Sequence, residues 1–300
     1  MKRIQIITGH YGSGKTEYAV NLALQLAETT ENVALADLDI VNPYFRSYEQ
    51  AKRMEDAGIR VIVTSCGGVA DIPAINPEVM SIFQQDKWTG VLDIGGNPIG
   101  ARVLARFAPQ LKQADFDLLF VLNANRPETR TVESAMQYMQ AIEAECRQKV
   151  TGIINNTHLC AETTPEEILK GAALAQQLSE ATGIPVVYHG VHRNFVSDVK
   201  DKITGTILPM NIYMKKPWEI FYEEEYYTMA GKVTFDRDRC KGCELCALVC
   251  PKHIIVMDED ATNRKGYHPA TVKPEDMEKC VGCASCAKMC PDSIITVEKD

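Results

Sequence analysis

The sequence predicts an α/β protein in which a mostly parallel sheet is flanked by helices, followed by a small α+β domain that binds metal. Two observations predict this. Short apolar runs alternate with amphipathic stretches over residues 3–205, as in sheets whose strands are connected by helices. Eight of the eleven cysteines fall within residues 240–300, and this clustering indicates metal ligation rather than a disulfide scaffold.

The strands are expected where apolar runs are short, because strands of a parallel sheet are buried on both faces. We expect them at residues 3–8, 33–37, 61–64, 91–94, 118–122, 151–154 and 185–188. Helices are expected between them, most clearly at residues 15–26, 128–146 and 165–182. The last of these begins with Pro165 and ends before Gly183, which is the usual placement of both residue types.

The chain is expected to have three parts. Residues 1–205 form the α/β domain, residues 206–231 connect it to the next domain, and residues 232–300 form the small domain. The connecting segment is rich in aromatic residues, so part of it is expected to pack as a short helix. The small domain contains an internal repeat, because residues 240–251 and 280–291 share one cysteine spacing.

Charge and hydropathy exclude several classes of partner. The net charge of -8 and the pI of about 5.4 oppose attraction to polyanions, so neither nucleic acid nor an anionic membrane surface is expected as a partner. No apolar stretch approaches the roughly 20 residues that cross a bilayer, and the first residues lack the apolar core of a signal peptide. A cytoplasmic location is therefore expected.

A phosphate-binding loop is expected after the first strand. The segment G-H-Y-G-S-G-K-T at residues 9–16 fits G-x-x-x-x-G-K-[ST] and opens the first helix. Its glycines let the backbone direct amide groups at phosphates, Lys15 reaches the β and γ phosphates, and the Thr16 hydroxyl binds Mg²⁺. A glycine turn that binds nothing is the alternative. The residues expected at this site are Gly9, Gly12, Ser13, Gly14, Lys15 and Thr16.

Two carboxylate motifs follow strand ends, where open α/β sheets bind ligands. They are V-A-L-A-D-L-D, with Asp37 and Asp39, and V-L-D-I-G-G, with Asp93 and Gly96. With the phosphate loop, they resemble the MinD, ParA and Mrp group of P-loop ATPases over roughly residues 1–205. The resemblance implies ATP and Mg²⁺ as ligands, Asp37 and Asp39 as residues that orient the attacking water and help hold Mg²⁺, and Asp93 as the Walker B carboxylate. A helix cap or loop carboxylate is the alternative for Asp37 or Asp39.

The segment G-I-I-N-N resembles the family strand whose terminal asparagine recognises adenine, which implies Asn156, with Asn155 close behind. An asparagine that satisfies a turn is the alternative. The chain departs from the family pattern K-G-G-x-G-K-T, because His10 stands in place of the first lysine and Tyr11 in place of the next glycine. In many relatives that lysine reaches the partner's nucleotide. Slow hydrolysis is therefore expected. The sequence does not decide whether the chain forms a homodimer when it binds ATP.

Both cysteine repeats follow C-x-x-C-x-x-C-x-x-x-C-P, the run of bacterial two-cluster ferredoxins. In such proteins each cluster is held by three cysteines of one run and the fourth of the other. The expected sets are Cys240, Cys243, Cys246 and Cys290 for one cluster, and Cys280, Cys283, Cys286 and Cys250 for the other. A zinc site explains neither the third cysteine nor the proline. Two 4Fe-4S clusters are the expected cofactors.

Residues 257–277 make the span between the runs longer than in minimal ferredoxins, and residues 263–269 are expected to form a hairpin turn. Together with C-A-K-M-C-P-D at residues 286–292, this region resembles the ferredoxin-like delta subunit of 2-oxoacid:ferredoxin oxidoreductases. The resemblance covers about residues 230–300. It implies electron transfer with a redox partner protein, for which a 2-oxoacid:ferredoxin oxidoreductase is a candidate.

Three functions follow as hypotheses. The first is an ATP-binding iron–sulfur protein, an ATPase that couples nucleotide state to electron transfer. The second is a cluster or metal carrier of the Mrp type, although such carriers use a C-x-x-C in the ATPase domain and this chain has none outside the repeats. The third is a non-hydrolysing ferredoxin subunit of a complex. Cys66 is a further candidate functional residue, whereas Cys146 is expected to be a buried helix residue.

Overall fold

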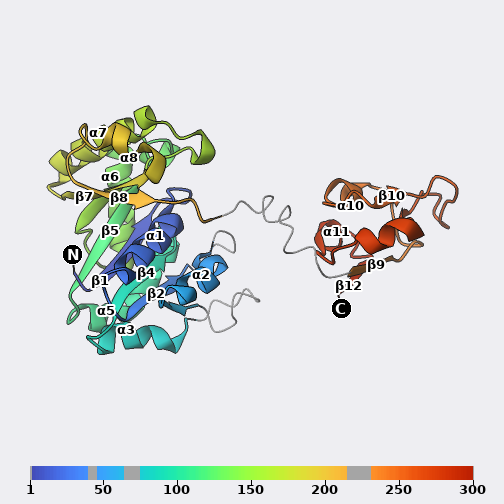
Figure 1. Cartoon of the computed structure of the whole chain (residues 1–300), viewed down its shortest axis with the longest axis horizontal. Helices are drawn as coiled ribbons and strands as arrows, with labels where there is room; N and C mark the ends of the chain where they lie inside the picture. The colour runs from blue at the N-terminus through green and yellow to red at the C-terminus, as the bar shows by residue number, and fades with distance from the viewer. Residues whose placement is uncertain (1, 40–45, 64–74, 215–230, 300) are drawn as a thin grey trace. The chain divides into compact units, whose positions relative to one another are not determined.

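The computed structural model describes residues 2–39, 46–63, 75–214 and 231–299. The chain divides into two compact units, Met1–Met214 and Lys215–Asp300, and Figure 1 shows the elements of each unit. The sequence places the end of the first domain at residue 205, whereas the first unit extends to Met214. The further residues belong to an edge strand and its docked continuation, which are described below.

An eight-stranded sheet forms the centre of the first unit, and all of its neighbouring strands are parallel. The strand order is β3-β2-β4-β1-β5-β6-β7-β8. The strands are β1 (Ile4–Gly9), β2 (Val33–Leu38), β3 (Arg60–Ile62), β4 (Thr89–Ile94), β5 (Phe116–Leu122), β6 (Gly152–Asn155), β7 (Val186–His192) and β8 (Thr206–Met210). The central β1 lies between β4 and β5, so the loop that follows β1 lies where parallel sheets bind ligands.

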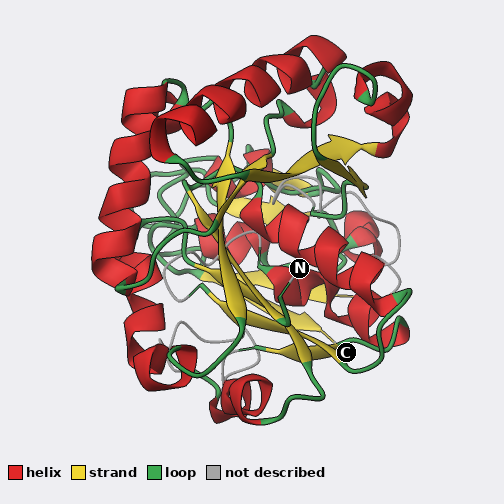
Figure 2. Cartoon of the chain, turned by 90° about the vertical axis from the view of Figure 1, so that its left-hand side faces the viewer, coloured by secondary structure: helices red, strands yellow, loops and turns green. Residues whose placement is uncertain are grey.

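Helices cover both faces of this sheet (Figure 2). Helix α1 (Lys15–Ala27) packs on one face, where Ile7 and Tyr18 share a core. On the other face, Ile6 packs in a core with α6 (Val132–Cys146) and α7 (Pro165–Thr182). The shorter helices are η1 (Ser47–Gln50), α2 (Ala51–Asp56), η2 (Pro77–Val79), α3 (Met80–Gln84), α4 (Pro98–Ala101), η3 (Arg102–Phe107), α5 (Ala108–Leu111), η4 (Pro127–Thr129), η5 (Cys160–Glu162), η6 (Arg193–Phe195) and α8 (Val196–Val199). The predicted α/β class is confirmed.

Two predicted boundaries differ from the structure. Strand β8 occupies the start of the segment that the sequence assigns to the connection, and it pairs with β7 in parallel. Its signal is weak because it is an edge strand with alternating burial and an internal Pro209, a residue that sheet edges tolerate. The helix expected from residue 128 instead begins at Val132, since the Thr131 hydroxyl accepts a hydrogen bond from the Ser134 amide and caps it.

The second unit contains two antiparallel pairs of strands. Strand β9 (Gly231–Phe235) pairs with β12 (Ile295–Lys299), and β10 (Ile255–Met257) pairs with β11 (Ala270–Val272). The turn expected at residues 263–269 connects β10 to β11. The helices are α10 (Leu245–Leu248), η8 (Pro274–Lys279) and α11 (Ser285–Met289). In the described parts of both units, no helix combines the length and the apolar composition that a membrane span requires.

Candidate functional site

The phosphate loop connects β1 to α1 at the centre of the sheet. Gly9 and Gly14 have φ angles of +144° and +79°, which side-chain-bearing residues rarely adopt. A Cβ atom on Gly9 would also strike the backbone oxygen of Val121 in β5. The glycines expected from the motif are thus needed for the path of the backbone. Lys15 follows the loop and is only 6% exposed, so its ammonium group lies inside the site.

Side chains from two neighbouring strand ends hold this loop. The Asn156 side-chain amide donates to the carbonyl oxygens of Ser13 at 2.9 Å and Gly14 at 3.3 Å. Arg126 Nε donates to the Gly12 carbonyl oxygen at 2.8 Å. Asn156 therefore positions the loop, and its contact with adenine stays a prediction. The sequence gives no signal for Arg126, because its contact joins positions far apart in the chain.

The three predicted carboxylates come together beside the loop. Asp37 of β2 and Asp93 of β4 are aligned on adjacent strands, and both are buried together with Asp39. The Asp39 amide donates to Asp37 Oδ1 at 3.1 Å. Arg46, which the sequence analysis did not identify, donates from Nε to Asp37 Oδ2 at 2.9 Å. Burial lowers the pKa of Arg46, but the hydrogen bond to Asp37 and the charges of the three carboxylates outweigh it, so the pKa is raised overall.

Asp93 has the properties of a cation ligand. Burial raises its pKa to about 7, an effect that the nearby Lys15 ammonium opposes and the Asp37 carboxylate strengthens. The Thr16 hydroxyl hydrogen-bonds to Asp93. Asp93 Oδ1 is buried and has no hydrogen-bond partner among the described residues. A buried acceptor without a partner, next to a hydroxyl, fits a hard cation such as Mg²⁺ with oxygen ligands.

Gly96, which follows β4, lies against the phosphate loop. A Cβ atom there would lie 2.6 Å from Lys15 Nζ and would displace the ammonium group from its position. Tyr138 of α6 donates to the Gly96 carbonyl oxygen at 2.7 Å. The Tyr138 ring also packs edge-on against His10, at 5.0 Å between centroids, and His10 Nε2 lies 3.3 Å from Glu128 Oε2. His10 is therefore held at the loop by α6 and the preceding turn.

His158 gives a testable pH dependence. His158 lies against the phosphate loop, because a Cβ atom added to Gly14 would be only 2.8 Å from its Nε2. Burial, followed by the charge of Arg126, lowers the pKa of His158 to about 4. The unfolded chain takes up a proton near its ordinary pKa of about 6.5, so this contribution to stability is complete above pH 6.5 and is lost as pH falls toward 4. We expect the wild-type free energy of unfolding to fall between pH 7 and 5 by about 2 kcal/mol more than that of His158→Gln.

Urea unfolding followed by far-UV circular dichroism at both pH values measures this difference. Replacing the exposed His253 of the second unit in the same way is the control. Equal pH dependence in wild type and His158→Gln would contradict the assignment.

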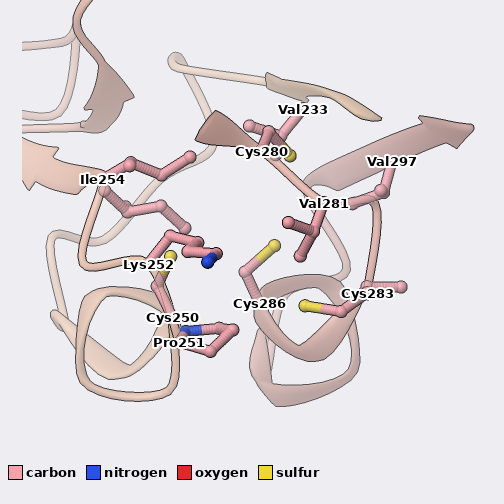
Figure 3. Close-up of a pocket in the computed structure, with 12 residues that line it drawn as sticks. Val233, Cys250, Pro251, Lys252, Ile254, Cys280, Val281, Cys283, Cys286 and Val297 are labelled. Atoms are coloured by element: carbon pink, nitrogen blue, oxygen red, sulfur yellow. The ribbon is translucent and has the colours of Figure 1, made fainter. Parts of the chain in front are cut away.

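The eight cysteines surround two cavities in the second unit. One cavity is lined by Cys280, Cys283, Cys286 and Cys250 (Figure 3). The other is lined by Cys240, Cys243, Cys246 and Cys290. Each cavity thus combines three cysteines of one run with the fourth cysteine of the other, as the sequence predicts. Among the described residues no three His, Cys, Asp or Glu side chains converge on a single ion; the thiols instead ring these cavities.

The two runs share one backbone conformation. Gly242 and Gly282 have φ angles of +66° and +64°, and Glu244 and Ala284, at the helix starts, have φ angles of +62° and +57°. Non-glycine residues in the left-handed backbone conformation cost free energy and are concentrated at functional sites. Burial, together with neighbouring thiols that include Cys250, raises the pKa of Cys286 to about 11. These thiols would lose their protons on binding iron, and their number, grouping and apolar surroundings fit two 4Fe-4S clusters.

Parts of the predicted site lie outside the described residues. These are Cys66, the residues that follow Asp39 up to position 45, and most of the connecting segment, residues 215–230. Cys146 is buried in α6 as expected.

A sequence profile of the 4Fe-4S dicluster domain family matches residues 224–294. A search of curated protein sequences finds no match for the chain. Among solved structures, the signal recognition particle receptor FtsY from Elizabethkingia anophelis in complex with GDP is 18% identical, with a TM-score of 0.42 over 64% of this chain and 58% of that one. FtsY from Mycoplasma mycoides is 17% identical, with a TM-score of 0.43 over 64% of this chain and 61% of that one.

A nucleotide-binding protein from Archaeoglobus fulgidus, in complex with ADP, is 15% identical, with a TM-score of 0.39 over 65% of this chain and 84% of that one. The chain spans less than two thirds of either FtsY chain. At this level of similarity nothing follows about the ligand or activity of this chain. The profile match, in contrast, supports the prediction of a two-cluster ferredoxin domain at the C-terminal end.

Proposed function

We propose that this chain is an ATP-binding iron–sulfur protein, a slow ATPase that couples nucleotide state to electron transfer through two 4Fe-4S clusters. The observation that carries the proposal is the presence of both sites in one chain. One is a glycine loop with a buried lysine opposite three carboxylates. The other is a pair of cavities with four cysteines each. The electron donor or acceptor is a partner protein, for which a 2-oxoacid:ferredoxin oxidoreductase is our candidate.

In the proposed reaction, water attacks the γ phosphorus and the bond to the β–γ bridging oxygen breaks, which yields ADP and inorganic phosphate. The loop amides and Lys15 bind the phosphates and stabilise the charge that spreads over their oxygens. Thr16 and Asp93 would hold Mg²⁺, which neutralises phosphate charge when bound, and Asp37 and Asp39 orient the water, as in MinD, ParA and Mrp ATPases. His10 in place of the family lysine supports slow turnover. We also propose that the chain forms a homodimer when it binds ATP.

The clusters would supply one-electron chemistry at low potential. The contribution of the chain is to bury four of the eight cysteines and to donate hydrogen bonds to sulfur. The Gly242 and Ala270 amides both donate to Cys240 Sγ, at 3.5 and 3.4 Å. Such bonds favour the reduced, more negative cluster and so raise its reduction potential. The cysteine sets thus fit resident clusters that exchange electrons.

Oxygen-free reconstitution, iron and sulfide counting, and ATPase assays of oxidised and reduced protein test the proposal. We expect about eight irons per chain, Mg²⁺-dependent ATP binding, and turnover that changes with cluster oxidation state. Reversible reduction of stable clusters supports the redox function. Rapid loss of clusters to apo-protein acceptors would instead support a carrier, and turnover on the order of tens per second by the isolated protein would contradict slow hydrolysis.

A further inference from the structure

Residues 211–214 follow β8 directly, and the chain continues from them into the unit that holds the cysteines. We call these four residues the exit strap. Two of its backbone amides are bound by one carboxylate of α1. The Tyr213 amide donates to Glu17 Oε1 at 2.9 Å, and the Met214 amide donates to Glu17 Oε2 at 3.0 Å. Glu17 is the residue after Thr16, so this contact begins at the edge of the phosphate site.

The next turn of α1 holds the start of the exit strap. Asn21 lies four residues after Glu17, on the same side of the helix. Its side-chain oxygen accepts from the Asn211 amide at 2.8 Å, and its Nδ2 donates to the Asn211 carbonyl oxygen at 3.0 Å. Four hydrogen bonds therefore join the exit strap to the helix that begins at the phosphate loop.

A second element reaches the exit strap from the carboxylate side of the site. Gln50, the last residue of η1, donates to the Tyr213 carbonyl oxygen at 2.9 Å. The Arg53 guanidinium lies 4.6 Å from the centre of the Tyr213 ring. Helix η1 begins immediately after Arg46, which is bound to Asp37. Tyr213 is thus held both by the helix that follows the phosphate loop and by the segment that is anchored at the carboxylates.

We propose that the exit strap, from which the chain continues into the iron–sulfur unit, senses occupancy of the nucleotide site from these two sides. This inference rests on the proposed binding of Mg²⁺ and ATP. A cation bound to the carboxylates competes with Arg46 for Asp37, because both positive groups need the same negative charge. Release of Arg46 moves η1 and with it Gln50. Phosphate binding at the start of α1 acts on Glu17 one residue away, so both changes reach Tyr213.

The proposal requires the exit strap to have two states whose populations the nucleotide shifts. Hydrogen exchange of the full, cluster-loaded chain measures these states at the amides of Tyr213 and Met214. We expect Mg²⁺ with a non-hydrolysable ATP analogue to change exchange in residues 211–214 by at least about threefold. Gln50→Ala should reduce the response while the analogue still binds, since it removes the contact from the carboxylate side and leaves those with Glu17 in place.

Glu17→Gln has the same shape as the native side chain but turns one acceptor into a donor, so one strap amide loses its partner. We expect exchange at residues 213 and 214 to become about tenfold faster without nucleotide. Glu28→Gln removes the same charge at the exposed far end of α1 and should change nothing.

Calorimetry on the same samples separates the two proposals. If the analogue does not bind to wild-type protein, the proposed function fails. If it binds but exchange in the exit strap is unchanged, or if Gln50→Ala responds as wild type does, nucleotide binding stands and the sensing role of the exit strap is wrong.

Discussion

Replacing Cys286 with alanine should lower the iron content from about eight to about four atoms per chain after oxygen-free reconstitution. Cys286 is buried in the cavity that it shares with Cys250, and none of the eight cysteines lines both cavities. A cubane that loses one of its four thiolates is expected to be lost, whereas the other cavity keeps all of its ligands. Iron analysis and electron paramagnetic resonance of the reduced protein measure the result. Cys160→Ala, at an exposed thiol of the first unit, is the control and should retain all iron.

The same experiment distinguishes two patterns of ligation. In crosswise ligation each cluster is held by three cysteines of one run and the fourth of the other, whereas in sequential ligation each run holds its own cluster. Crosswise ligation predicts that Cys250→Ala gives the same residual spectrum as Cys286→Ala, because both line one cavity. It also predicts that Cys290→Ala matches Cys246→Ala, which line the other. If each run held its own cluster, Cys250→Ala would instead match Cys246→Ala. Complete loss of iron in every one of these variants would contradict two separately assembled sites.

Much of the fold was predictable because it depends on local patterns. Strands such as β1 and β2 are short apolar runs with no polar face, and only burial on both sides produces that pattern. Helix α7 carries its own boundaries, with Thr164 as its cap, Pro165 in the first turn and Gly183 at the end. Strand β8 lacks such a signal, since its burial alternates and it contains a proline. Its place in the sheet depends on contacts with β7 that no local pattern records.

The residues of the candidate sites divide in the same way, into those that a local sequence pattern reveals and those that only the structure reveals. Glycines of the phosphate loop and the cysteine runs are recognisable because the ligand chemistry requires fixed spacing between near neighbours. Arg46, Arg126 and Tyr138 are found only in the structure. Arg126 and Tyr138 act on residues that are distant in the sequence: Arg126, for example, bonds to Gly12, 114 positions away. Arg46 binds Asp37 from nine positions further along the chain, where no motif marks it. Such contacts leave no spacing rule in the sequence, and the same holds for the exit strap, where Tyr213 meets Glu17.

Lys15→Met should weaken binding of Mg²⁺ and ATP by at least about 100-fold, or roughly 2.8 kcal/mol. Lys15 is the buried cation of the phosphate loop, and methionine keeps its length and apolar stem while removing the charge. Isothermal calorimetry measures the change. Lys112→Met removes an equal charge from an exposed site after α5 and should leave the affinity unchanged. Retention of wild-type affinity by Lys15→Met would show that the loop does not bind the phosphates.

Lys15→Met should remain folded, because Asp93 can take up a proton when the nearby ammonium group is removed. Removing one partner of a buried ion pair is usually costly, because the remaining charge is left without compensation. The pKa of Asp93 is already about 7, and Lys15 is the group that lowers it most. Without the ammonium the pKa of Asp93 rises further, so the carboxyl group becomes neutral near pH 7 and avoids most of that cost. We therefore expect the melting temperature of Lys15→Met to stay within about 4 °C of wild type at pH 7. Above pH 7 the wild-type Asp93 is ionised in the folded state and its effect on stability levels off, whereas the folded variant still holds a proton that the unfolded chain has released. The melting temperature of the variant should therefore fall further below that of wild type as pH rises, until the pH reaches the higher Asp93 pKa of the variant.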